Sequence, residues 1–303
     1  MKRNRLYHHR KRTVQPTMFG WILLLCSWLS LLPVAAYLFR PAHKSAYRPA
    51  PLAQAVFAAQ EETRPELISS IRNLPAIRSL RSDEPTILIY HTHTTEAYTQ
   101  TEDAQYRETS KWRTSDQENN VIAVGETLKT ILERDYGFRV IHDTTDHEPP
   151  KLKTAYERSA ATMERYHKEN PSIVLMIDLH RDAYETDQAP CDFLTIDGRE
   201  TAKLMFVVGK GEKYVDKPYY DANLAFAERM TKHLNGISEK LCRPVRQKPG
   251  RYNQHVAPYC MLVEVGHNAN TLAQAKNAMP YLAESIAYAF QTEEISLSDW
   301  TPN

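Results

Sequence analysis

Short apolar runs alternate with amphipathic segments along the chain after residue 85. Five runs have the length and composition of buried strands: 86–90, 138–143, 172–179, 202–209 and 259–266. Three of the intervening segments carry apolar residues at helical spacing: 119–137, 151–170 and 222–241. This alternation favours an α/β layer architecture, with a mostly parallel sheet flanked by helices.

Capping residues mark the ends of several predicted helices. Gly137 is placed as a C-terminal cap, and Pro171 ends the second helix. Thr271 and Gln274 have the spacing of a capping box, which predicts that a last helix begins there. We therefore assign residues 85–303 to one domain of three layers.

The N-terminal part of the chain has a different composition. Residues 1–17 carry six Lys and Arg side chains, and residues 18–39 contain no charged residue. At about 1.5 Å per helical residue, such a segment spans the roughly 30 Å of a bilayer core. The positive-inside rule then predicts one transmembrane helix at 18–39, a cytoplasmic N-terminus at 1–17 and an extracytoplasmic domain. A cleavable signal peptide is the alternative.

Residues 40–84 read as a linker, because they contain five prolines and scattered charges. The net charge of the whole chain is only +1, so the part that follows the basic N-terminus is negative. A nucleic-acid partner is therefore not expected for the main domain.

The cysteines argue against a disulfide framework in an exported domain. Cys26 lies in the predicted anchor, which leaves Cys191, Cys242 and Cys260, an odd and sparse set. At most one disulfide is expected, and Cys260, at the start of an apolar strand, is expected to be a buried thiol.

Residues able to do chemistry follow three of the predicted strands. In open α/β sheets, ligands bind outside the carboxyl ends of the strands, where the loops converge. These ends carry, in chain order, His91, His93 and Glu96; His180 and Arg181; and Glu264. We expect these side chains to meet in one site.

Two imidazoles and one carboxylate are a typical ligand set for catalytic zinc, which leaves a coordination position open for water. We predict His93, Glu96 and His180 as the zinc ligands. Zinc-activated water needs a further group that accepts its proton and passes it to the leaving amine. Glu264 is predicted to be this proton shuttle.

Further polar residues near these motifs are candidates for supporting roles. His91 is expected to support the metal ligands from behind, because strand alternation points it away from His93. Asp116 is an alternative to Glu96 as the third ligand. Arg181 could bind a substrate carboxylate or pair with a neighbouring aspartate. Two residues before the last strand could line the cleft or merely turn the chain: Asn253 and Gln254.

Four motifs, ILIYHTHTTEAY, IDLHRDA, RYNQH and LVEVGHNANT, resemble those of the stage II sporulation protein P family over roughly residues 85–292. The resemblance implies a domain similar to zinc-dependent N-acetylmuramoyl-L-alanine amidases, acting on peptidoglycan stem peptides as amidase and endopeptidase during sporulation engulfment. It also implies stage II sporulation proteins D and M as partners. His93, His180 and Glu264 carry over from the motifs directly, whereas the third ligand stays open between Glu96 and an acid near Asp116.

Two other functions fit the same residues. The order His93, Glu96, His180, Glu264 also resembles that of zinc carboxypeptidases, in which case Arg181 would hold the free C-terminus of a peptide. The third hypothesis is a non-catalytic, wall-binding scaffold that recruits a hydrolase.

Overall fold

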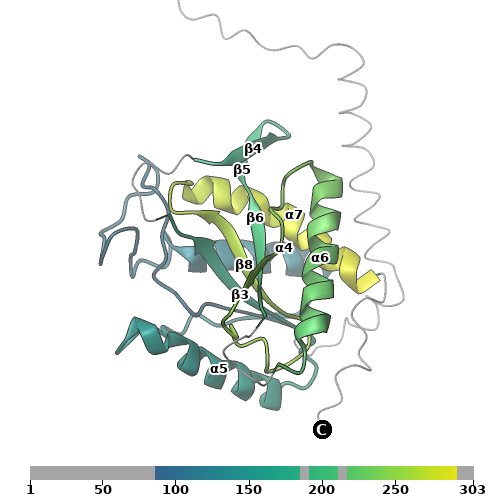
Figure 1. Cartoon of the computed structure of the whole chain (residues 1–303). Coiled ribbons are helices and arrows are strands. Elements are labelled where there is room, and N and C mark those ends of the chain that lie inside the picture. The colour runs from purple at the N-terminus through teal and green to yellow at the C-terminus, as the bar shows by residue number, and fades with distance from the viewer. Residues whose placement is uncertain (1–85, 185–190, 211–216, 292–303) are drawn as a thin grey trace, which may run out of the picture. The chain divides into compact units, whose positions relative to one another are not determined.

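The computed structural model describes residues 86–184, 191–210 and 217–291 (Figure 1). The predicted basic N-terminus, anchor and linker lie outside these described residues. Within them, no helix is both long and apolar enough to cross a membrane.

A six-stranded sheet forms the centre of the domain, in the order β2-β1-β3-β8-β6-β7 (Figure 1). Its strands are β1 (Ile87–Tyr90), β2 (Val140–His142), β3 (Leu175–Asp182), β6 (Leu204–Gly209), β7 (Arg246–Lys248) and β8 (Cys260–His267). All neighbours pair in parallel except β6, which runs antiparallel to β8. The mostly parallel sheet expected from the sequence is thus confirmed.

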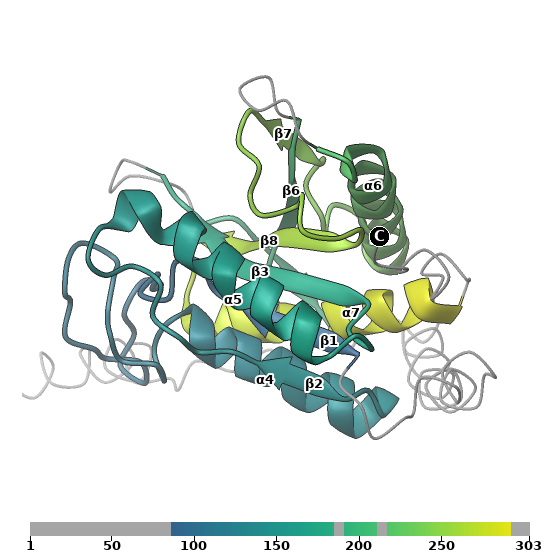
Figure 2. The ribbon, with the colours of Figure 1, turned by 90° about the horizontal axis from the view of Figure 1, so that it is seen from below.

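Helices cover both faces of this sheet (Figure 2). They are α4 (Val121–Tyr136), the short 3-10 helix η1 (Leu152–Thr154), α5 (Ala155–Glu169), α6 (Tyr220–Ile237) and α7 (Leu272–Gln291). α4 packs against α7 on one face, and α6 packs beside β6 and α7. α5 lies across the opposite face, which gives the three layers.

The predicted helix ends are also confirmed. Gly137 has a left-handed φ of 77°, and its N–H donates to the Glu133 carbonyl at the end of α4. At the start of α7 (Leu272–Gln291), the Gln274 N–H donates to Thr271 Oγ1 and the Thr271 N–H donates to Gln274 Oε1, both at 3.1 Å. This reciprocal pair is the capping box read from the sequence.

One predicted strand end was wrong. His180, Arg181 and Asp182 lie inside β3 and not after it. β3 pairs with β1 only as far as Asp178, but its ladder with β8 continues past the apolar run to Asp182 and places polar side chains within the strand. The predicted strand 259–266 already contained Glu264, and β8 confirms that placement.

A hairpin of β4 (Phe193–Ile196) and β5 (Arg199–Ala202) was not foreseen. Its turn, Asp197-Gly198, has φ values of 51° and 74°, as a tight two-residue hairpin requires. The Asp-Gly pair was therefore the available signal. The edge strand β7 has no apolar alternation and gave no such signal.

The cysteines of the described residues are free thiols. Cys242 and Cys260 are buried, and Cys191 is exposed. The prediction of a buried, unpaired Cys260 is confirmed.

Gly125 of α4 lies against a buried pair of histidines. His91 Nδ1 donates to the Leu179 carbonyl at 2.8 Å, and His91 Nε2 lies 2.9 Å from His142 Nε2. A Cβ on Gly125 would stand 2.7 Å from His142 Nε2 and 2.9 Å from His91 Nε2. The helix can approach β1 and β2 this closely only because residue 125 has no side chain.

Gly125→Ala is expected to destabilise the domain, although alanine is the better helix former. The added methyl group overpacks the histidine pair, at about 1–3 kcal/mol in the free energy of unfolding. Gly236→Ala in α6 is the matched control, because a Cβ there meets nothing within 4 Å, and it should stabilise by up to about 1 kcal/mol. Urea unfolding of both variants measures the difference, and equal stabilisation by both would contradict the tight contact.

Candidate active site

The predicted residues from three chain segments meet on the face of the sheet that α5 covers. His180 of β3 is the direct neighbour of Glu264 in β8, so both side chains project to the same face. His93, in the loop after β1, has its ring centroid 5.4 Å from that of His180. Glu96 lies in the same loop, and its carboxylate reaches His180. The structure therefore brings His93, Glu96, His180 and Glu264 together.

His180 is held between two carboxylates. Its Nε2 lies 2.8 Å from Asp178 Oδ1, and its Nδ1 lies 3.3 Å from Glu96 Oε2. Burial alone would lower the pKa of His180, but the charges and hydrogen bonds of Asp178 and Glu96 raise it well above its usual value. Asp178 also accepts bonds from the backbone N–H and hydroxyl of Thr92, at 2.8 and 2.6 Å. These contacts fix the orientation of the His180 ring.

Glu96 is a buried carboxylate that stays ionised. Burial would raise its pKa, but the bond to His180 and the charges of His180 and Arg181 hold the pKa well below its usual range. The Arg181 backbone N–H donates to Glu96 Oε2 at 3.2 Å, and Arg113 Nη2 lies 3.7 Å from Oε1. An anionic oxygen is therefore available beside His180.

His93 offers a neutral imidazole. Burial and the neighbouring charge of His180 lower the pKa of His93. Its Nδ1 is buried and has no hydrogen-bond partner among the described residues, with Glu148 Oε1 3.7 Å away. A buried ring nitrogen of this kind is a ready electron-pair donor.

Glu264 is a buried carboxyl group with a pKa near 7. Burial raises the pKa of Glu264 to about 7; the carboxylates of Glu96 and Asp182 add to the increase, and His180 opposes it. Its Oε2 is buried without a hydrogen-bond partner in the described part of the chain. A group with a pKa near 7 can both accept and release a proton in one reaction cycle.

The cluster fits a zinc ion by its chemistry. Across residues 86–184, 191–210 and 217–291, no three His, Cys, Asp or Glu side chains already stand in metal-binding geometry. In this arrangement His180 forms ion pairs with Asp178 and Glu96 instead. The donor set of two imidazoles and one carboxylate is nevertheless the one that zinc prefers, and the buried His93 Nδ1 is an unused donor within it.

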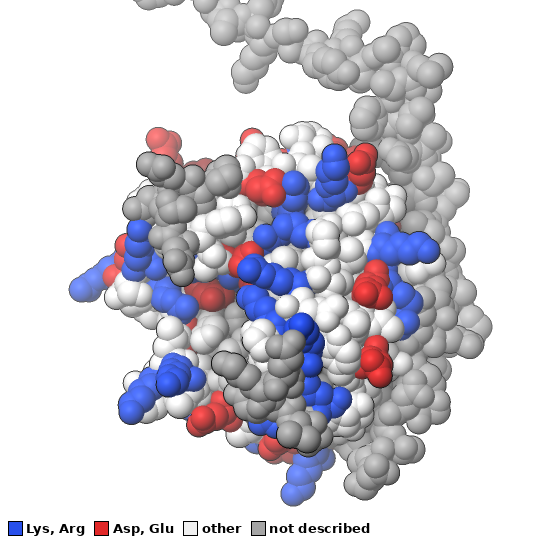
Figure 3. All heavy atoms as spheres, viewed as in Figure 1, with Lys and Arg blue, Asp and Glu red and all other residues white. Residues whose placement is uncertain are grey.

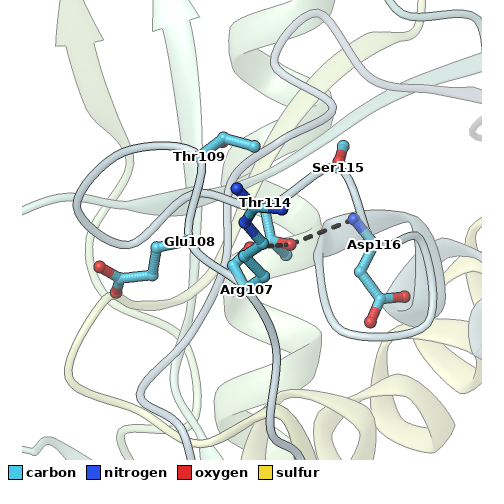
Figure 4. A pocket seen from close by; sticks show the side chains of 6 residues that line it. All are labelled: Arg107, Glu108, Thr109, Thr114, Ser115 and Asp116. Carbon is cyan, nitrogen blue, oxygen red and sulfur yellow. Dashed lines mark hydrogen bonds between the residues drawn. The ribbon is translucent and has the colours of Figure 1, made fainter.

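Asp116 lies apart from this cluster. Its exposed carboxylate accepts bonds from the Glu118 N–H and the Asn119 side chain, at 3.0 and 2.8 Å. Figure 4 shows it in a hollow of the loop before α4, which no other candidate residue lines. The carboxylate that reaches His180 is therefore that of Glu96.

The Arg181 guanidinium is occupied by backbone carbonyls. It donates to Ala97 at 2.8 Å and to Trp112 at 2.9 Å, and the side chain is buried. Arg181 thus ties the loops after β1 to β3. His91, expected to support the ligands, points to the opposite face and contacts His142, with its pKa lowered by burial to about 3.

Asn253 and Gln254 mainly shape the chain before β8. Gln254 accepts from the Gly209 N–H and donates to the Val207 carbonyl, so it braces β6. The Asn253 amide lies 2.8 Å from Ser159 Oγ of α5. Ser159 also contacts Thr92 Oγ1 at 2.8 Å, so Asn253 is connected to the loop after β1.

Two site residues were not among the predicted ones. Asp178 stands two positions before His180 in the same strand, and this period-two spacing was the signal that could have found it. Tyr156 of α5 places its ring edge-on to those of His93 and Tyr252, with both centroid distances 5.6 Å. Only tertiary packing brings Tyr156 to the site.

The fold and the site define the class of protein: a mixed α/β domain that carries a cluster of histidine and carboxylate side chains on its sheet. The family model of Stage II sporulation protein P matches residues 45–287. The chain therefore belongs to the stage II sporulation protein P family. A curated relative, Stage II sporulation protein P of Bacillus subtilis (strain 168), is 27% identical over 221 residues. That match covers 70% of this chain and 53% of the relative, so the chain spans about half of the relative's length.

Solved structures with a similar arrangement have low identity. The N-acetylmuramoyl-L-alanine amidase AmiC2 of Nostoc punctiforme is 16% identical, with a TM-score of 0.40 over 70% of this chain and 98% of that one. The CwlD amidase from Clostridioides difficile, solved in complex with the GerS lipoprotein, is 13% identical, with a TM-score of 0.43 over 70% and 98%. Scores of this size define neither the site nor the activity of this chain.

The raised pKa of Glu264 makes stability depend on pH in the metal-free protein. The unfolded group titrates near 4.5 and the folded one near 7, so the stability contributed by the protonated group is complete below about pH 4.5 and is lost as pH rises through about 7. Over that pH range the free energy of unfolding of the parent should fall by on the order of 3 kcal/mol, whereas that of Glu264→Gln should not show this decrease. Urea unfolding with a chelator, from pH 4.5 to 8, measures this difference. A difference that does not change with pH would contradict the assignment.

Proposed function

We propose that this protein is a zinc-dependent peptidoglycan hydrolase that acts as an N-acetylmuramoyl-L-alanine amidase during sporulation, with endopeptidase action on stem peptides as its second activity. The observation that carries the proposal is the buried cluster of His93, Glu96, His180 and Glu264, in which burial raises the pKa of Glu264 to about 7. Membership of the stage II sporulation protein P family supports the sporulation role.

His93, Glu96 and His180 would hold the zinc ion. When bound, zinc supplies a Lewis acid that polarises a carbonyl group and lowers the pKa of water. Glu264 accepts the proton of the attacking water and delivers it to the leaving amine. Asp178 keeps the His180 ring in place through its ion pair with Nε2, and Tyr156 packs against His93.

The two other functions have less support. A carboxypeptidase would use Arg181 for the free C-terminus, but its guanidinium already donates to the carbonyls of Ala97 and Trp112. A non-catalytic scaffold would gain nothing from Glu264, whose buried Oε2 lacks a partner among the described residues and therefore costs stability.

We also propose that residues 18–39 anchor the protein in the cell membrane, with the catalytic domain on the extracytoplasmic side and proteins D and M of stage II sporulation as partners. The uncharged segment behind a basic N-terminus supports this placement. Protease added to intact protoplasts should digest residues 85–303. Full protection of that domain, with digestion after lysis, would overturn the placement.

Substitution of the proposed ligands should release zinc. His93→Ala, His180→Ala and Glu96→Gln are each expected to lower bound zinc well below one ion per chain, because three donors are needed for tight binding. Asp116→Asn is the matched control, since its carboxylate serves the loop before α4, and it should retain zinc. Metal analysis of the purified variants measures the outcome. If Glu96→Gln retains zinc and Asp116→Asn loses it, Asp116 and not Glu96 is the third ligand.

Glu264→Gln should separate metal binding from chemistry. Glutamine keeps the size of the side chain but cannot accept a proton, and general acid–base catalysis contributes about 10²–10⁴-fold in rate. Release of stem peptides from purified wall should fall by that order while zinc content and fold persist. Near-normal turnover would exclude the proton shuttle, and loss of zinc would move Glu264 among the ligands.

A further inference from the structure

A second polar cluster lies beyond Glu264, toward the carboxyl ends of β3 and β8. Asp182 of β3 and His267 of β8 are partners in the strand register. Arg243, in the segment after α6, donates from Nη1 to Asp182 Oδ2 at 3.0 Å, and Arg246 Nη1 lies 3.8 Å from the same oxygen. We call Asp182, Arg243 and His267 the Arg243–His267 cluster.

This cluster has more hydrogen-bond donors than acceptors. Arg243 Nε and Nη2 and His267 Nε2 are buried and have no hydrogen-bond partner among the described residues. His267 Nδ1 accepts from the Ala269 N–H at 3.1 Å, so the neutral ring carries its proton on Nε2. Burial and the charge of Arg243 lower the pKa of His267, which favours that neutral form. Three buried N–H groups therefore lack an acceptor among the described residues. Buried donors without an acceptor lower the stability of the folded protein.

The two unused nitrogens of Arg243 form one edge of its guanidinium group. Nε and Nη2 present parallel N–H bonds that match the two oxygens of a carboxylate. Arg134 uses the same edge elsewhere in this protein, where Nε and Nη2 each contact one carboxylate oxygen of Asp135 at 2.7 Å. In Arg243 the remaining nitrogen is committed to Asp182, which fixes the edge in place.

The position of the cluster relates it to the candidate active site. Asp182 follows His180 by two residues in β3, or about 7 Å along a strand. The Arg243 N–H donates to the Leu204 carbonyl at the start of β6, which lies beside the end of β8 because the two strands are antiparallel. Figure 3 shows Lys and Arg side chains gathered in a band over the face that carries β6 and β7.

We propose that the Arg243–His267 cluster binds a carboxylate group of the peptide substrate, about two residues from the bond that is cleaved. The proposal rests on the proposed function and names the chemical feature by which the site would select its peptide. A planar monoanion suits the cluster better than a phosphate dianion, because Asp182 lies beside the donors and repels additional negative charge.

The test compares two soluble muramyl peptides that differ only in one stem-peptide carboxylate, which is free in one and a carboxamide in the other. The full-length, zinc-loaded protein is assayed with both. Arg243→Gln should raise KM for the carboxylate peptide by on the order of 10–100-fold, the range for hydrogen bonds to a charged group, with kcat little changed. KM for the carboxamide should not respond to the variant.

Arg134→Gln is the matched control, because Arg134 has the same guanidinium edge in an exposed ion pair on α4. It should behave as the parent with both peptides. Arg243→Lys keeps the positive charge but lacks the two parallel N–H groups of the guanidinium edge. It should therefore lose most of the preference for the carboxylate peptide. If Arg243→Gln fails to fold, this second variant decides the outcome. An equal change with both peptides would indicate a purely structural Arg243, and no change would also overturn the proposal.

Binding of the same peptides by calorimetry separates this inference from the proposed function. If the parent cleaves neither peptide, the hydrolase assignment fails. A preference of the parent for the carboxylate peptide, lost in Arg243→Gln, would still support the subsite. Equal binding of both peptides by the parent would refute it.

Discussion

The pairing of β3 with β1 on one side and with β8 on the other is the constraint on which the candidate site depends. It sets His180 beside Glu264 and brings the loop after β1, with His93 and Glu96, over the same face. Because side chains alternate along a strand, a slip of one residue in β3 would turn His180 to the other face and bring Arg181 in its place. The register is itself held by fully buried apolar residues in all three strands.

This constraint places several charges in a buried position, where each needs compensation. Asp178, His180 and Glu96 form a chain of opposite charges, and Thr92 and the Arg181 backbone supply further hydrogen bonds to the carboxylates. A buried ion pair adds little stability over apolar packing. The arrangement is therefore better understood as a preorganised site than as a source of stability for the fold.

The sequence predicted five of the six strands of the main sheet, the helix caps and the meeting of His93, Glu96, His180 and Glu264 on that sheet, because periodicity and strand position are local properties. It did not predict strand order, the reversal of β6 or the continuation of β3 through Asp182, since these depend on which strands pair. The sequence also did not predict the positions of Tyr156 and Arg243, because a helix and a loop distant in sequence bring them to the sheet. The sequence could not decide between Glu96 and Asp116 as the third ligand, because both are acids in the segment between β1 and α4. Only their places in the fold distinguish them.

The antiparallel β6 has a consequence for how such a domain can diversify. Its reversal brings the segment between α6 and β7 to the sheet edge where β3 and β8 end, although His93, Glu96, His180 and Glu264 all lie outside that segment. If the Arg243–His267 cluster binds substrate as proposed, substitutions in this segment would change substrate preference and leave the residues on β3 and β8 intact. Relatives would then diverge in the peptides they accept by altering a single connecting segment, with the fold conserved.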